Sequence, residues 1–133
     1  MQITRRAFMW TGLAAAAAWL GGLPRSRRLG PGTGLDPALR LVGCLDHRES
    51  ARTVGRACLA AQAARPSVAQ LVEDIAPPGS AMRASLARPG DAELRAALRS
   101  AVRRDFALGE VVRVDGWFLS KTEARLCMLA ARV

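Results

Sequence analysis

The side chains best suited to metal binding or catalysis are few in this chain. They are the three cysteines and the single histidine, at Cys44, His47, Cys58 and Cys127. Thiolate and imidazole are the preferred ligands of zinc, and the short spacing of Cys44 and His47 lets both face one ion. No second close pair completes the site, so Cys58 and Cys127 would have to converge from distant elements. The sequence therefore contains an incomplete metal-binding pattern and predicts no bound cofactor.

The odd number of cysteines leaves two other interpretations open. Cys44 and Cys58 lie on adjacent predicted helices, where a disulfide between them would leave Cys127 free. Alternatively, Cys58 and Cys127 are small buried residues of the core, because both lie on apolar helix faces.

Motifs of common enzyme classes are absent from the sequence. It has no glycine-rich phosphate loop, no nucleophile elbow and no His-Glu-x-x-His. With one His and no Tyr, general acids and bases are scarce. His47 lies beside Asp46 and Glu49 at the start of a predicted helix, where an imidazole is typically a surface or capping residue. These features favour a non-catalytic protein.

Short helices must position these residues. Helix starts are predicted at Asp36, Asp46, Ser67, Asp91 and Ser120, from capping residues and from the capping-box spacing of Ser or Asp with Glu or Gln. One or two helical turns are the alternative to a loop over residues 80–86. The second helix is expected to end near Ala64, before Pro66, and the longest to end at Leu108, before the capping glycine Gly109. The residues predicted to face inward in the first helix are Leu39, Val42 and Leu45, and those in the long helix are Leu94, Leu98, Ala101, Val102 and Phe106.

The last quarter of the chain changes from a helical to a strand period. Alternating β-branched residues, Asp115-Gly116 and a second apolar run predict a β-hairpin over residues 111–119. The closing helix after Ser120 is apolar nearly all round, so it is either central to the core or covered by a partner. The predicted fold is mainly α, a small bundle of four to five short helices with this one hairpin.

The net charge of +9 is concentrated at the start of the chain. Five arginines precede Leu29, and the remaining residues carry 15 basic and 11 acidic side chains, for a net charge of +4. No basic run is interleaved with stacking aromatics. The composition therefore argues against nucleic acid as a partner.

The N-terminal segment has the plan of an export signal. Thr4, Arg5, Arg6 and Phe8 precede or begin an apolar stretch over residues 7–23, which is weakly hydrophobic and is followed by three more arginines. This pattern resembles the bacterial twin-arginine signals, although Trp10 stands where many of them have Lys. The predicted organisation is an export signal over 1–24, a Gly/Pro/Arg linker over 25–35 and a helical domain over 36–133.

The resemblance implies transport by the twin-arginine translocase to the periplasm or to the outer face of the cytoplasmic membrane. Cleavage of the signal and its retention as an anchor both remain open, and membrane contact is expected only through this segment. Because that route carries folded proteins, it implies a cofactor or a partner acquired before export. In general plan the chain resembles the small accessory subunits of periplasmic oxidoreductases.

A larger periplasmic protein is the partner expected from this resemblance. The predicted partner-binding residues are Trp117, Phe118, Leu119 and Arg125, because Trp and Arg are favoured at interfaces; in the alternative, Trp117 covers the small core. Two further hypotheses are a stand-alone envelope protein with a structural or ligand-binding role and a small carrier of a metal or cofactor.

Overall fold

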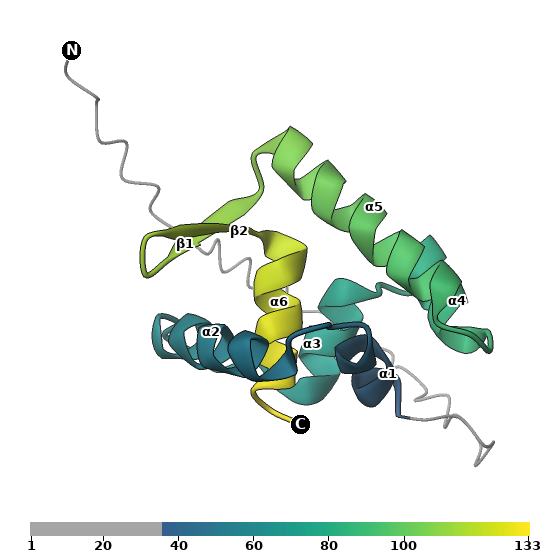
Figure 1. Ribbon diagram of the computed structural model, residues 1–133, viewed down its shortest axis with the longest axis horizontal. Coiled ribbons are helices and arrows are strands. Elements are labelled where there is room, and N and C mark those ends of the chain that lie inside the picture. Colours follow the sequence, from purple (N-terminus) through teal and green to yellow (C-terminus); the bar gives the residue numbers. More distant parts are fainter. Residues whose placement is uncertain (1–35) are drawn as a thin grey trace, which may run out of the picture. The chain divides into compact units, whose positions relative to one another are not determined.

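The computed structural model describes residues 36–133, which form six helices and one antiparallel hairpin (Figure 1). The predicted export signal and linker, residues 1–35, lie outside the described residues. The mainly helical class and the hairpin near the C-terminus are confirmed, with six helices where four or five were predicted. In chain order the elements are α1 (Pro37–Gly43), α2 (Arg48–Ala60), α3 (Val68–Ile75), α4 (Ala81–Ala87), α5 (Ala92–Leu108), β1 (Val111–Val114), β2 (Trp117–Ser120) and α6 (Lys121–Ala130).

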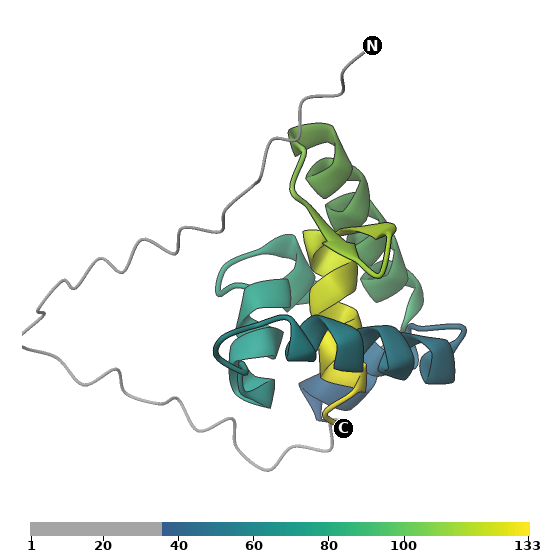
Figure 2. The same cartoon turned by 90° about the vertical axis from the view of Figure 1, so that its left-hand side faces the viewer.

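Helix α6 lies at the centre of the fold. It packs against α1, α2, α3 and α5 and against both strands, and the two views show it surrounded by these elements (Figure 1 and Figure 2). Six of its ten residues are buried, with Leu129 and Ala130 fully enclosed. The apolar residues on nearly all its sides are therefore explained by a central place in the core, and no external partner is needed to cover them.

Helices α2 and α6 cross in backbone contact at Gly55. A Cβ atom at this position would lie 1.9 Å from the carbonyl oxygen of Cys127 and 3.0 Å from the Cβ of Ala131. Only a residue without a side chain permits this approach. Gly55 thereby sets the spacing of the most extensive helix pair in the domain.

Local capping residues fix where several helices begin and end. The Ser67 hydroxyl accepts from the Gln70 amide at 3.1 Å, and the Gln70 side chain accepts from the Ser67 amide at 2.8 Å. The same capping box forms between Ser120 and Glu123 at the start of α6. Gly109 ends α5 in the left-handed conformation, with φ of 71°. These three predictions are confirmed, because each depends on residues close together in sequence.

The hairpin has the turn that its sequence predicts. Asp115 and Gly116 both have positive φ, 47° and 87°, as a two-residue type I′ turn requires. Val114 pairs with Trp117, and Val112 pairs with Leu119. Side chains alternate between the two faces of a strand, so Val112, Val114 and Leu119 share one face, which packs against the core.

The predicted inward faces of α1 and α5 are partly wrong. Leu39 is 49% exposed, and the buried face of α1 consists of Ala38, Leu41 and Val42. In α5, Phe106 is 47% exposed and Asp105 is turned inward in its place, with 5% exposure. The Asp105 carboxylate accepts from the buried Thr122 amide at 2.7 Å, near the start of α6. This bond satisfies both polar groups inside the core, which explains why a charged residue takes an inward position.

The predicted capping role of Asp46 at the start of α2 is also wrong. His47 is the N-cap residue and makes no side-chain capping bond. The Asp46 carboxylate instead accepts from Arg95 of α5 at 3.3 Å. The helix ends at Ala60, four residues before the expected end near Ala64. The local capping pattern is therefore not used, and the Asp46 carboxylate pairs with an arginine 49 residues away.

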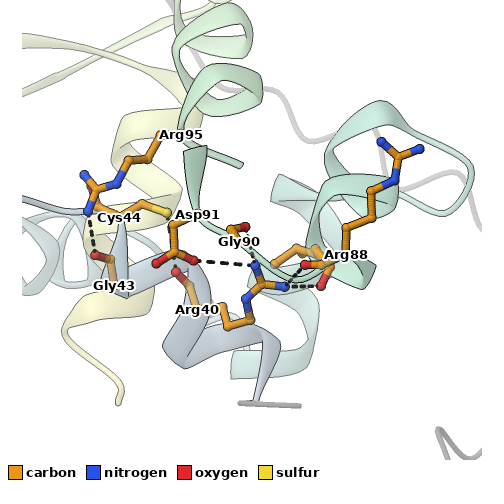
Figure 3. A network of polar contacts seen from close by, with 8 residues as sticks. Arg40, Gly43, Cys44, Arg88, Gly90, Asp91 and Arg95 are labelled. Carbon is orange, nitrogen blue, oxygen red and sulfur yellow. Dashed lines mark hydrogen bonds and ion pairs between the residues drawn. The ribbon is translucent and has the colours of Figure 1, made fainter. Parts of the chain in front are cut away.

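Two arginines connect α1 to α4 and α5 (Figure 3). The nearly buried Arg40 donates to the carbonyl oxygens of Leu86 and Arg88 at the end of α4, and to that of Gly90 at 2.9 Å. It also forms an ion pair with Asp91 at 3.5 Å. Carbonyls at a helix end have no partner within their helix, and a guanidinium supplies several donors to them. Arg40 therefore caps α4 and holds it on α1.

Arg95 and two further arginines make equivalent contacts at other helix ends. Arg95 donates to the carbonyl oxygens of Gly43 and Cys44 at the end of α1, at 3.3 and 3.0 Å. Arg52 donates to the last residue of α6 at 3.3 Å, and Arg125 donates to the last turn of α3 at 3.2 Å. Together with Arg40, four of the fifteen basic side chains after residue 28 therefore bond to carbonyl groups at helix ends.

No helix between residues 36 and 133 is both long and apolar enough to cross a membrane.

Candidate interaction surface

The exposed apolar side chains of residues 36–133 gather around the hairpin. Seven large apolar residues are exposed in this part of the chain, and five of them fall within residues 106–118. We call these five the hairpin surface: Phe106, Leu108, Val111, Trp117 and Phe118. Burying an aromatic side chain stabilises a protein, so aromatic residues left in water are candidates for contact with another molecule.

Trp117 and Phe118 point to opposite faces of the hairpin because they are consecutive in β2. Trp117 shares a face with Leu119 but lies next to the turn, where it is 76% exposed. Phe118 is 64% exposed on the outer face, and the Arg113 guanidinium lies over its ring, 5.8 Å from the centroid. The alternative in which Trp117 covers the core does not hold.

Bonds at the base of the hairpin hold it on the helical core. The Lys121 amide donates to the Glu110 carbonyl at 3.0 Å, so the chain is closed where β1 begins and β2 ends. The Asp105–Thr122 bond joins the end of α5 to α6 just below this point. The exposed aromatics are thus carried on a fixed support, which reduces the entropy lost when a partner binds.

Two of the four predicted partner-binding residues do not contribute to this surface. Leu119 is half-buried and packs against the core. Arg125 forms an ion pair with Asp74 at 3.7 Å and donates to the Asp74 carbonyl, so its guanidinium holds α3 on α6. Trp117 and Phe118 are the two predicted residues that the structure leaves exposed.

The cysteines and His47 are not brought together as a metal site. Among residues 36–133, no group of three or more His, Cys, Asp or Glu side chains is placed to hold an ion. All three cysteines are free, so Cys44 and Cys58 are not paired. Cys58 is buried in the core, as one of the two interpretations expected, and Cys127 is half-buried beside it.

Burial raises the pKa of all three thiols. It raises the pKa of Cys44 and Cys58 above the ordinary value of 9.0, and it raises the pKa of Cys127 to about 11, with a smaller contribution from the neighbouring Cys58. The thiolate is the form that attacks electrophiles and binds metals. In this environment the three cysteines are suited to packing.

The sequence analysis did not predict that α5 contributes to the hairpin surface, although the helical spacing of its buried residues indicated it. Leu94, Leu98 and Ala101 are buried, and Asp105 continues the same stripe four residues later. Phe106 lies about 100° around the helix from Asp105, given 3.6 residues per turn. The prediction that Phe106, and not Asp105, faces the core therefore gave the wrong orientation for the last turns of α5.

No family model, curated protein or solved structure matches this chain.

Proposed function

We propose that this protein is exported by the twin-arginine route and serves as a non-catalytic accessory subunit of a larger, cofactor-containing periplasmic enzyme. The motif formed by Thr4, Arg5, Arg6 and Phe8 supports the export route. The observation that carries the partner role is the exposure of Trp117 and Phe118 on a hairpin fixed to the core. The hairpin surface, including the end of α5, is the proposed docking site.

The central position of α6 changes which part of the chain is available to a partner. Since most of this helix is buried, it contributes the core and leaves docking to the hairpin surface. Truncation at Gly109 would remove α6 and unfold the domain. Point substitutions of exposed residues therefore test the proposal more sharply than a deletion.

The test compares Trp117→Ser/Phe118→Ser with a matched control, Leu39→Ser, which changes an exposed apolar residue of α1. Full-length protein with a C-terminal tag is recovered from its native envelope fraction and analysed by native mass spectrometry. We expect a larger companion in stoichiometric amount with the wild type and with the control. Aromatic interface anchors each contribute about 2 kcal/mol or more, so loss of both should cost about 4 kcal/mol or more, which is at least about 700-fold in affinity.

Thermal melts by circular dichroism check that all three proteins are equally folded. Recovery of the wild type as a lone chain would refute the accessory role and leave a stand-alone envelope protein. Retention of the companion by the double variant would refute the hairpin surface as the docking site.

A further inference from the structure

A shallow groove runs between α5 and α6, next to the base of the hairpin. Its volume is about 400 Å³, and its lining includes Leu98, Arg99, Val102, Arg103, Glu123 and Leu126. Leu98, Val102 and Leu126 form the apolar floor. Leu98 and Leu126 are buried and Val102 is half-buried, so Val102 is the part of the floor most open to a ligand.

Two arginines at the groove make no contact that stabilises the domain. Arg99 and Arg103 are exposed, and neither forms an ion pair within residues 36–133. They are spaced i and i+4 on α5, and Arg95 precedes them by another four residues. Like charges at this spacing destabilise a helix by about 0.2–0.5 kcal/mol per pair. Unlike the arginines that cap helix ends, these two guanidinium groups form no ion pair within residues 36–133.

The acidic residues at the groove are already engaged. The Asp46 carboxylate pairs with Arg95 at 3.3 Å, and the Glu123 carboxylate accepts from the Ser120 amide at 2.8 Å. Neither carboxylate forms an ion pair with Arg99 or Arg103, and the lining carries three arginines against two carboxylates. The unmet charge beside the apolar floor is therefore positive, and its complement is a row of carboxylates next to an apolar stripe.

We propose that this groove binds an acidic amphipathic helix of the partner protein. A helix places carboxylates at i and i+4 about 6 Å apart along its axis, which matches the spacing of Arg99 and Arg103 on α5. Its apolar stripe packs on Val102 between α5 and α6. The inference rests on the proposed function, because it names the chemistry of a partner segment that docks beside the hairpin surface.

Nucleic acid fits the groove less well. A groove that binds single-stranded nucleic acid combines positive charge with aromatic side chains. No aromatic side chain lines the groove between α5 and α6 to stack on bases.

The experiment uses three labelled probes and the full-length protein, followed by fluorescence anisotropy. The first probe is a synthetic amphipathic peptide of about 18 residues, long enough to form a helix, with Glu at i, i+4 spacing. The second has Lys in place of each Glu, and the third is a single-stranded oligonucleotide. We expect only the Glu peptide to bind, with an affinity that falls as salt is raised.

Charge reversal then locates the binding site. Arg99→Glu/Arg103→Glu replaces two attractions by two repulsions, and at about 0.2–1 kcal/mol for each exposed pair this weakens the Glu peptide about tenfold. The control, Arg56→Glu/Arg65→Glu, gives the same net charge with substitutions at exposed positions of α2 and the loop after it. It should change the affinity less than twofold. If Arg99→Glu/Arg103→Glu does not fold, the neutral variant Arg99→Gln/Arg103→Gln is used in its place.

Equal losses in the two double variants would show a response to net charge alone and would overturn the proposal. So would equal binding of the Lys peptide, binding of the oligonucleotide through Arg99 and Arg103, or no binding of the Glu peptide. The hairpin variant Trp117→Ser/Phe118→Ser keeps this groove intact. Loss of the native companion in that variant, together with failure of the Glu peptide to bind, would retain the proposed function and reject this inference alone.

Discussion

Replacement of Gly55 by Ala tests the central helix pair of this fold. In an ordinary helix interior this substitution is stabilising, by up to about 1 kcal/mol, because Ala restricts the unfolded chain and has the higher helix propensity. Here the added Cβ would lie 1.9 Å from the Cys127 carbonyl oxygen, so α2 and α6 must separate. The structure therefore predicts the opposite sign from the one that helix propensity predicts.

The size of the effect follows from these two contributions. Overpacking that displaces backbone costs about 3 kcal/mol, and the gain from Ala offsets about 1 kcal/mol of it. The free energy of unfolding should thus fall by about 2 kcal/mol. For a domain of this size each kcal/mol lowers Tm by about 4–8 °C, so we expect a decrease of about 8–16 °C.

The assay is urea and thermal denaturation followed by circular dichroism, with Gly43→Ala as the matched control. Gly43 is the last residue of α1, and a Cβ there would meet only the Arg48 guanidinium, at 3.8 Å. The control should be as stable as the wild type or slightly more stable. If Gly55→Ala behaves like Gly43→Ala, then α2 and α6 do not cross in backbone contact at Gly55.

Two further predictions concern the start of the chain and the buried carboxylate. The proposed twin-arginine route predicts that replacing both Arg5 and Arg6 by Lys stops export, because the receptor of that route reads the arginine pair. Fractionation of cells should then find the variant in the cytoplasm, and unchanged export of the variant would rule out the twin-arginine route. Asp105→Ala should lower the free energy of unfolding by about 1–3 kcal/mol, because the buried Thr122 amide loses its acceptor. Asp105→Asn keeps an oxygen acceptor and should cost less in the same urea titration; equal losses would show that the charge, and not the hydrogen bond, is required.

The sequence by itself determined those features that depend on residues within about one helical turn of each other. The capping boxes at Ser67 and Ser120, the end of α5 at Gly109 and the turn at Asp115-Gly116 were all predicted correctly. In each case a side chain bonds to nearby backbone, or a backbone conformation favours particular residues. Such preferences act before any distant contact forms, so they can be read along the chain.

Tertiary structure decided which side of each helix is covered and which polar groups are satisfied there. Leu39 and Phe106 are as apolar as their buried neighbours, and only the positions of the other helices leave them exposed. Asp105 is inward because the Thr122 amide, 17 residues away in sequence, needs an acceptor. Asp46 does not cap α2, and its carboxylate pairs with Arg95, 49 residues away in sequence.

The hairpin surface and the groove between α5 and α6 also depend partly on local sequence and partly on tertiary packing. The hairpin that carries Trp117 and Phe118 is a local structure, and its sequence was sufficient to predict it. The exposure of both aromatics and the position of Arg99 and Arg103 beside Val102 depend on how α5 and α6 pack. Packing of this kind joins residues far apart in the chain, and no local pattern specifies it, because the same apolar stripe is compatible with more than one neighbouring helix.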